Sequence, residues 1–581
     1  MPWPSAGYSS EPGAMAARPS PTATRAQDPL LLHNCSLQGL RERLPLRWPT
    51  PAGTTPSPKR RYRSFYTYQG PGELEDPGTW EVGDPFDLLL LLVDFSGLRD
   101  VLAGLLGWTS GRGWMPYDPV SIFLLLGWQI TQGWSRAGAL RELARKDHRD
   151  YARRFGFRDG VYPTEGGLRH FLTALGSHSG HRSVVVDEER GLCVGVERLN
   201  ALLAQSVWLL REAGLIGDAA WEQALVCPDG MLHAAASALR CTAVSDSCYQ
   251  PTSPAAPRPC PAREKGHRGC GCDTPACAAH CRHATPRDPE ARYVWHRGAN
   301  GPENSPNAPR QGDGDETRPG KGRGVYGYRT LPIELADLGR RFGVVLLDTL
   351  GAATAREEVY AAALLLLLGD YYPTFGVSAV AGDAAFGYDV VLEVVFEDLG
   401  ARRVLDQRAH PSDENRAGWV LRGYDHRGRP ICPYGYALRA NGHDARKRRH
   451  KWVCAQACRR VGASPRVEVE GVAYPPTQCP YAAAERAPQG KVLNVGARFP
   501  DGSLRLVRDL PVGTPAWKRL YHRARNAAEG RHATLERWGL KRLPVYGTPR
   551  VRALLFLADV WLNLTTLARL VREATVAASL R

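Results

Sequence analysis

Residues 514–550 read TPAWKRLYHRARNAAEGRHATLERWGLKRLPVYGTPR, and the local signals in this stretch agree with one another. Thr514 can cap the start of a helix, Pro515 suits its first turn, and Gly539 follows the last good helical residue. We therefore expect one helix of about 24 residues, roughly 36 Å long at about 1.5 Å per residue.

The expected helix is strongly basic. Residues 516–550 contain nine Lys or Arg side chains and only two carboxylates. An acid surrounded by cations on a long helix is suited to holding a metal ion beside a phosphate backbone. The alternative is a solvated basic helix, and this stretch alone leaves both open. Helical spacing places one set of side chains along a single face: Tyr521, Arg525, Glu529, His532 and Glu536.

Length and charge indicate the class of protein. The chain has 581 residues, a formal net charge of +16 and a pI near 9.3. This length predicts three or four domains with at least one large core. The positive charge favours a polyanionic partner, nucleic acid before an anionic membrane surface.

The distribution of apolar residues and cysteines indicates a cytosolic protein. The chain has no uninterrupted run of 18 apolar residues and no charged-then-apolar start typical of a signal peptide. We therefore expect no membrane partner, and a cytoplasmic location. In a reducing compartment the 14 cysteines are expected to be metal ligands or core residues rather than disulfides.

The first 225 residues divide into two parts. Residues 1–84 are rich in Pro, Ser, Gly and Arg, and we expect a mobile basic arm, either with loose affinity for nucleic acid or without function. Residues 85–225 have apolar spacing typical of helices, with Asp118 and Ser135 as expected N-caps. Basic faces on this all-helical domain favour DNA contact over a purely structural role.

Residues 226–410 have the pattern of a mixed α/β sheet covered by helices. Short apolar runs predict strands, and the order is strand, two paired strands, helix, strand, helix, strand. Asp229 and Asp383 each follow one of these runs. Open α/β sheets tend to place their sites at the carboxyl ends of strands.

Two insertions interrupt this core before the final segment, residues 514–581. Residues 245–324 carry a dense cysteine cluster, which is either a zinc site or a set of free thiols. Residues 411–513 carry a second set, which suits one tetrahedral structural zinc, with buried thiols as the alternative. The second set consists of Cys432, Cys454, Cys458 and Cys479.

The second insertion also contains a basic run. Arg446, Arg448 and Lys451 belong to a sequence with five Lys or Arg side chains between residues 446 and 451. Such a run contacts phosphates if a folded support holds it, and is otherwise a solvated charge cluster.

Three acids stand out by context: Asp229, Asp383 and Glu529. Cleavage of a phosphodiester by two divalent ions needs carboxylates that converge on metals about 3.5–4 Å apart. Mg²⁺ prefers oxygen ligands and keeps several waters, so a few carboxylates suffice. Two strand-end aspartates and a helix glutamate meet this demand if the helix packs on the sheet. The structural alternatives are a turn at Asp229 and a helix cap at Asp383.

Several of these stretches resemble one known family. AGDAAFGYD after an expected buried strand, CPDGMLHAAAS, and YHRARNAAEGRHATLERWGLKRLPVYG are similar to segments of bacterial insertion-sequence transposases of the DDE superfamily. The last segment resembles the family's Tyr, Arg, Glu signature through Tyr521, Arg525 and Glu529. Glu536 stands where the family pattern has a Lys, so Glu529 and Glu536 both remain candidates for the third acid, with Glu529 preferred.

The resemblance implies a ribonuclease-H-like catalytic domain preceded by helices, using Mg²⁺ or Mn²⁺ on Asp229, Asp383 and Glu529. It implies binding to the terminal inverted repeats of a mobile element and to target DNA as a dimer or larger multimer, with Arg525 near the scissile phosphate and Tyr521 and His532 on the same face. A nucleoid-associated location follows. The alternatives are an inactive transposase-derived DNA-binding protein, or a nuclease of the same fold that does not join strands.

Overall fold

The centre of the molecule is a five-stranded sheet built around β5 (Ala224–Pro228), of which every residue is buried. On one side of β5 lie two antiparallel strands, β10 (Ile333–Ala336) and then β11 (Gly343–Leu347). On the other side lie two parallel strands, β13 (Val377–Gly382) and then β14 (Arg402–Leu405). The expected paired strands and the strands before Asp229 and Asp383 are therefore confirmed.

The computed structural model describes only part of the chain. The described residues are 45–50, 61–69, 85–108, 115–178, 180–189, 191–237, 288–296, 317–318, 322–336, 343–405, 423–424, 429–444, 449–454, 466–467, 474, 492–496, 510 and 515–579.

The two faces of this sheet pack on different helices. Alternate residues of a strand point to opposite faces, and Leu225 and Cys227 lie in an apolar cluster with α15 (Pro515–Arg537). Small residues on α15, including Ala524 and Ala527, let its backbone lie close to the strands. Val226 belongs instead to the main core, which contains the leucines of α12 (Glu357–Tyr371). The expected long helix beginning at Pro515 and the expected helix after the paired strands are both confirmed.

A second sheet continues from the first. Its path is β12-β9-β6, and β7 and β8 also pair with β9. The strands are β6 (Met231–Ala234), β7 (Arg292–His296), β8 (Thr317–Arg318), β9 (Gly322–Thr330) and β12 (Leu350–Ala352). Between Gly382 and β14 the chain forms η5 (Ala384–Phe386), α13 (Asp389–Glu393) and η6 (Val394–Asp398).

Helices dominate residues 85–225. They are α2 (Pro85–Leu92), η2 (Phe95–Gly97), α3 (Leu98–Leu105), α4 (Pro119–Thr131), α5 (Arg136–Leu143), η3 (Lys146–His148), α6 (Arg149–Arg154), α7 (Glu165–His178), α8 (Asn200–Glu212) and α9 (Asp218–Glu222). The expected N-caps are confirmed: Asp118 accepts from the N–H of Val120, and Ser135 accepts from that of Gly138.

The expectation of an all-helical domain here is wrong for one hairpin. β3 (His181–Asp187) and β4 (Leu192–Glu197) pair as antiparallel strands. Consecutive valines in β3 favour a strand because β-branched side chains fit a pleated surface. Gly191 has φ +62°, which suits the turn between the strands.

The expectation of a mobile arm over residues 1–84 is wrong for two segments. Leu46, Trp48 and Tyr66 are buried in the main core, and β1 (Leu46–Arg47) pairs with β2 (Val93–Asp94). The indole N–H of Trp48 donates to Gln205 at 2.6 Å. Short apolar anchors in a polar context leave no periodic pattern, so the sequence did not reveal them.

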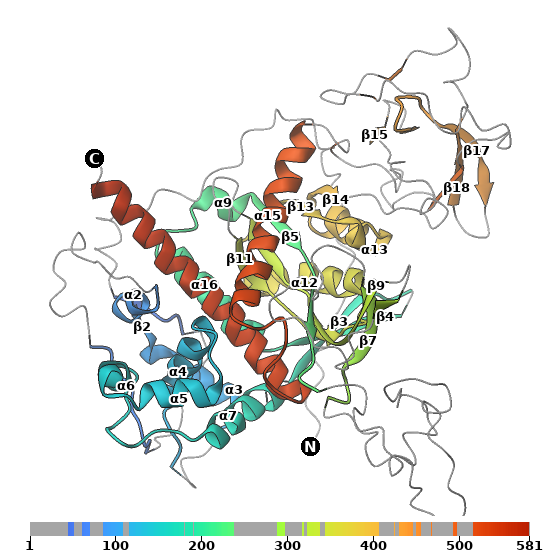
Figure 1. The fold of residues 1–581 in the computed structure, drawn as a ribbon. Helices are drawn as coiled ribbons and strands as arrows, with labels where there is room; N and C mark the ends of the chain where they lie inside the picture. Colours follow the sequence, from blue (N-terminus) through green and yellow to red (C-terminus); the bar gives the residue numbers. More distant parts are fainter. Residues whose placement is uncertain are drawn as a thin grey trace, which may run out of the picture.

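The long C-terminal helix α16 (Thr548–Ser579) joins the N-terminal helices to the central sheet, packing on α2, α4, α7, α8 and β11 (Figure 1). The Trp561 ring stacks between Phe86 and Phe123, at 5.0 Å from each. The Asn563 side chain exchanges two hydrogen bonds with the backbone of Val345 on β11. By length and composition α16 could cross a membrane, but its apolar part is 89% buried inside the protein, as in a core helix.

The close packing of α4 against α16 predicts that one added methyl group at Gly127 will lower the stability of the protein. A Cβ at Gly127 would lie 1.8 Å from the Trp561 ring. We expect Gly127→Ala to lower the free energy of unfolding by about 1–3 kcal/mol in urea denaturation. Gly104→Ala on α3 is the control: a Cβ there meets nothing within 4 Å, and we expect a gain of about 0.5–1 kcal/mol. A Gly127→Ala variant as stable as the control would contradict this packing.

The second insertion contributes short strands. β15 (Gly423–Tyr424) pairs with β16 (Pro430–Ile431), and β18 (Arg449–Val453) pairs with both β17 (Arg439–Asp444) and β19 (Val492–Gly496). The cysteine cluster of residues 245–324 lies outside the described residues.

Candidate active site

Two carboxylates follow neighbouring strands of the central sheet. Asp229 comes directly after β5 and Asp383 directly after β13. Because these strands are parallel and paired, with Val380 opposite Val226, both aspartates lie at the same edge of the sheet. Asp229 is only 5% exposed, and Asp383 caps η5 by accepting from the N–H of Ala385 at 2.8 Å. Asp383 is therefore both the N-cap of η5, as the structural alternative predicted, and a carboxylate at the sheet edge.

Helix α15 brings a guanidinium and a third carboxylate to this edge. Arg525 Nη1 lies 2.8 Å from Asp229 Oδ2 and 4.0 Å from Asp383 Oδ2. Arg525 Nη2 lies 3.9 Å from Glu529 Oε1, one helical turn further along. Three carboxylates from separate segments of the chain therefore meet around one cation. Glu536 instead lies 3.9 Å from the ammonium of Lys541.

Burial and mutual charge shift the pKa values of Asp229, Asp383 and Arg525. Burial raises the pKa of Asp229, and the attraction of Arg525 offsets only part of that rise. The pKa of Asp383 is also raised, by burial first and then by repulsion from Asp229. Burial opposes the charge of Arg525, but the carboxylates, Asp229 first, raise its pKa above the ordinary value. Arg525 therefore stays protonated, and a cluster of acids this close is stabilised by a cation.

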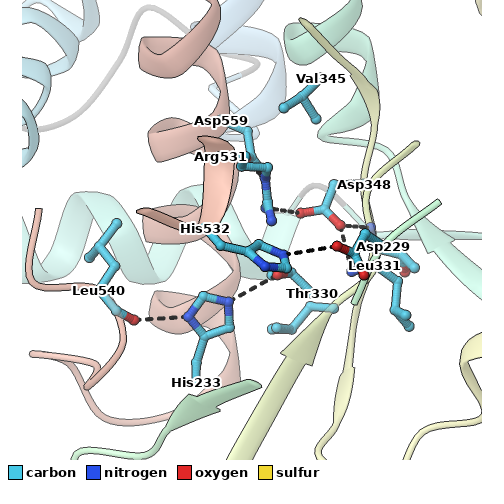
Figure 2. Close-up of polar contacts among 12 residues, drawn as sticks. Asp229, His233, Thr330, Leu331, Val345, Asp348, Arg531, His532, Leu540 and Asp559 are labelled. Atoms are coloured by element: carbon cyan, nitrogen blue, oxygen red, sulfur yellow. Dashed lines mark hydrogen bonds and ion pairs between the residues drawn. The ribbon is translucent and has the colours of Figure 1, made fainter. Parts of the chain in front are cut away.

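His532 lies at the same edge. Its Nε2 is 3.9 Å from Asp229 Oδ2, and its side chain is 22% exposed. Figure 2 shows the ring directed toward that carboxylate. The Nε2 atom itself is buried, and it has no hydrogen-bond partner among the described residues. Burial, followed by the charges of Arg531, Lys541 and Arg525, holds the pKa of His532 well below its ordinary value. The imidazole is therefore neutral.

A second histidine, His233, is fully buried on β6 behind the site (Figure 2). Its Nδ1 lies 2.8 Å from the carbonyl oxygen of Leu540, so Nδ1 carries the proton and donates it. Its Nε2 then accepts from the Thr330 hydroxyl at 2.9 Å. Burial lowers the pKa of His233 to about 3, so this neutral ring ties β6, β9 and the end of α15 together.

Arg531 links α15 to α16 and to the end of β11 through a buried ion network. Its Nε and Nη2 contact the two oxygens of Asp559 on α16, at 2.9 and 3.1 Å, and Nη2 also contacts Asp348 Oδ2 at 3.2 Å (Figure 2). All three side chains are at most 1% exposed. Asp348 also accepts from the N–H of Leu331, and its own backbone N–H donates to Asn200. The sequence did not reveal this network, because its members have no common motif or spacing.

A fourth acid lies beneath α15. Glu334 on β10 is fully buried opposite Cys227, and neither of its carboxyl oxygens has a hydrogen-bond partner among the described residues. Burial raises its pKa to about 8, with further contributions from Asp229 and Asp559 and an opposing one from Arg531. The side chain is therefore mostly protonated near neutral pH.

This pKa predicts a pH dependence of stability. The pKa rises from 4.5 to about 8 on folding, so the contribution of Glu334 is full below the lower value and is lost as pH rises through the higher one. Between these two pKa values the free energy of unfolding falls by about 1.4 kcal/mol per pH unit. In the wild type, the free energy of unfolding should fall as pH rises from about 5.5 to about 7.5. We expect Glu334→Gln, which cannot ionise, to make this fall smaller by about 2–3 kcal/mol, measured by urea denaturation with EDTA. Glu397→Gln, at an exposed position, is the control. Equal pH profiles for both variants would contradict this assignment.

Another ion pair borders the site. Arg329 on β9 pairs with Glu357 at the start of α12. A Cβ at Gly230 would lie 2.5 Å from Glu357 Oε2, so a larger residue after Asp229 would displace the end of the Glu357 side chain. Burial lowers the pKa of Arg329, and the nearby Asp383 acts against that decrease.

The other expected site residues are placed differently. The Tyr521 ring stacks on Trp517 at 4.2 Å and packs in the apolar cluster under the start of α15. Lys451 is half-buried on β18, whereas Arg446 and Arg448 lie outside the described residues. Of the expected zinc ligands, Cys432 is buried and Cys454 packs beside it; Cys458 and Cys479 also lie outside the described residues.

The donor set at the sheet edge is suited to a divalent cation. Carboxylate oxygens are the ligands that Mg²⁺ prefers, and the buried Asp229 Oδ2 pairs here with Arg525 Nη1 at 2.8 Å. Within the described ranges, no three His, Cys, Asp or Glu side chains already form a metal-binding group. In this arrangement Arg525 is the cation that contacts all three acids.

The fold and the site together define a mixed α/β protein with a carboxylate–arginine cluster at the edge of its central sheet. Comparison of the chain with protein-family models, with curated proteins and with solved structures gives no match.

Proposed function

We propose that the chain is a DNA transposase that cuts at the ends of a mobile element and joins the freed 3′-hydroxyl to target DNA. One observation carries this proposal: Arg525 contacts Asp229, Asp383 and Glu529, the three acids expected to hold the metal ions. Such convergence is a demanding condition for acids separated by more than a hundred residues each.

The order and directions of the strands in the central sheet support a more specific fold assignment. Three antiparallel strands, β11, β10 and β5, are followed by parallel β13 and β14, with α15 across one face. We infer that this is a ribonuclease-H-like domain, in which strand-end aspartates and a helix glutamate share one edge.

The residues of the site have separate roles in this mechanism. Asp229, Asp383 and Glu529 would hold two Mg²⁺ or Mn²⁺ ions, which supply activation of a water or 3′-hydroxyl and stabilisation of the leaving oxygen. Arg525 is positioned to neutralise charge on the phosphate near the scissile bond. The helix carries further exposed cations, Lys518, Arg519 and Arg537, which suit contact with the phosphate backbone.

The partners follow from this activity. The chain would bind terminal inverted repeats and target DNA as a dimer or larger multimer, in a nucleoid-associated state. In the second insertion, Cys432 and Cys454 would contribute to a structural zinc site together with Cys458 and Cys479, and Arg446, Arg448 and Lys451 would contact DNA.

The test uses the full chain and duplexes that carry the sequences flanking its reading frame. We expect metal-dependent nicking in Mg²⁺, followed by joining of the 3′-end to a supercoiled plasmid. Nicking without joining would indicate a nuclease instead, and a gel shift without any nicking would indicate an inactive DNA-binding protein. Either result would overturn the transposase assignment.

A further inference from the structure

A group of arginines lies outside the carboxylate site, around the start of α5. Arg136, the first residue of α5, is 14% exposed and lies 3.7 Å from Glu165 at the start of α7. Its Nη1 donates to the carbonyl oxygen of Pro544 at 3.4 Å, in the segment that leads into α16. Arg136 therefore lies where α5, α7 and the segment before α16 meet.

Arg169 and Arg550 bring two more positive charges to this place. Arg169 is exposed and lies one turn beyond Glu165 on α7. Arg550, in the first turn of α16, is half-buried, and a Cβ on Gly547 would lie 3.6 Å from its Nη2. Burial lowers the pKa of Arg136; the charge of Glu165 acts against that decrease, and the charges of Arg169 and Arg550 add to it. Arg136, Arg169 and Arg550 are called the arginine patch below.

The positive charge of the arginine patch exceeds the negative charge beside it. In the described part of the chain, Glu165 pairs with Arg136, and neither Arg169 nor Arg550 forms an ion pair. Like charges held together disfavour the folded state through their mutual repulsion. A partner with many negative charges relieves that repulsion and fits such a surface.

The surface beside Arg169 carries no side chains that would keep a partner away. Gly166 and Gly167 are exposed in the first turn of α7, and a Cβ on either would come no closer than 3.6 Å to Thr164 Oγ1. Packing inside the protein therefore does not require glycine here, although glycine weakens a helix. Two glycines permit close approach of a sugar–phosphate strand to the helix backbone.

The arginine patch is within reach of DNA held at the carboxylates. Gly133, in the turn before α5, lies at the end of α15, because a Cβ there would be 3.5 Å from the carbonyl oxygen of Arg537. Arg525 is about 18 Å further back along this helix, at about 1.5 Å per residue. Phosphates of one strand repeat about every 3.4 Å, so a strand needs about five nucleotides to span this length.

We propose that the arginine patch binds the phosphate backbone of duplex DNA, as a contact separate from the carboxylate site. This inference rests on the proposed function only in taking DNA as the polyanion. Because phosphates are the same in every sequence, the patch is expected to strengthen the binding of any duplex.

Salt-dependent binding of the full chain tests this proposal. Fluorescence anisotropy in EDTA measures binding of two labelled duplexes, one with the sequence that flanks the reading frame and one scrambled. We expect the double variant Arg169→Gln, Arg550→Gln to bind both duplexes at least about tenfold more weakly at physiological salt. The slope of log K against log salt concentration should also become shallower by about 1.8. Arg569→Gln is the matched control and should change neither quantity, because Arg569 is exposed further along α16.

A variant that removes negative charge separates DNA binding from a structural role. Glu165→Gln breaks the ion pair with Arg136 but takes the carboxylate out of the patch. We therefore expect tighter DNA binding, by about threefold or more, whereas a purely structural cluster predicts no gain. Circular dichroism and thermal unfolding establish that each variant is folded.

Three results would overturn the proposal. The first is an equal salt slope for the double variant and Arg569→Gln, and the second is no gain in DNA binding by Glu165→Gln. The third is a double variant that loses binding to phosphatidylserine vesicles while its DNA binding is unchanged, which would indicate a membrane surface instead.

This proposal and the transposase assignment fail separately. Nicking and joining by a chain whose salt slope does not depend on Arg169 and Arg550 would leave the transposase standing and remove the patch. Patch-dependent DNA binding by a chain that neither nicks nor joins DNA would leave the patch standing and remove the transposase.

Discussion

Asp383→Asn is expected to abolish the proposed nicking of end-containing DNA, lowering its rate by at least about 10³-fold, because losing a carboxylate that we propose to bind metal would remove several kcal/mol of transition-state stabilisation. The substitution removes the charge and little else. An Asn oxygen can still accept from the N–H of Ala385, so the cap of η5 is kept. Loss of the charge also relieves repulsion with Asp229.

The measurement is single-turnover nicking in Mg²⁺ together with a gel shift on the same duplex. Binding is expected to stay within about threefold of the wild type, because the cations that neutralise phosphates are unchanged. Asp398→Asn, at an exposed position at the end of η6, is the matched control and should nick normally. Wild-type nicking by Asp383→Asn would remove Asp383 from the catalytic group.

The largest expected effect on stability is at Arg531. Replacing it with Met leaves Asp348 and Asp559 buried without their cation, and removing one member of a buried ion network costs about 3–5 kcal/mol. Burial and Asp559 already raise the pKa of Asp348 well above its ordinary value. Asp348 would therefore take up a proton, and the variant should lose more stability at pH 8 than at pH 6.

Urea denaturation measures this effect. Arg537→Met is the control, since Arg537 is exposed on the same helix, and we expect a change within about 0.5 kcal/mol. Adding Asp559→Asn to Arg531→Met should restore part of the loss by removing one buried charge. If Arg531→Met were as stable as Arg537→Met, the network would not be what holds α15 in place.

The sequence predicted the parts of the site that depend on strand direction and helix spacing. Asp229 and Asp383 follow apolar runs that became adjacent parallel strands. Arg525 and Glu529 are four residues apart, which fixes them on one helix face. Glu529 lies near Arg525, whereas Glu536 lies beside Lys541; the choice between them as third acid stays a prediction.

The parts that the sequence did not reveal depend on contacts between distant segments. Arg531, Asp348 and Asp559 come from three elements, and only the packed structure shows that they neutralise one another. The burial of Trp48 also depends on a distant segment, because its indole N–H donates to Gln205. In β3, three valines had a short apolar pattern that helix and strand share, and tertiary pairing with β4 decided between them.

The position of α16 has a consequence for synthesis on the ribosome. Trp561 and Asn563 complete contacts to α2, α4, α8 and β11, which are made hundreds of residues earlier. The nascent chain cannot close its interior until this last segment has left the exit tunnel. The Arg531–Asp559 link to α15 forms at the same late moment. Premature termination before Asp559 would therefore release a chain with an exposed apolar interior and an unanchored α15, which cellular proteases would degrade.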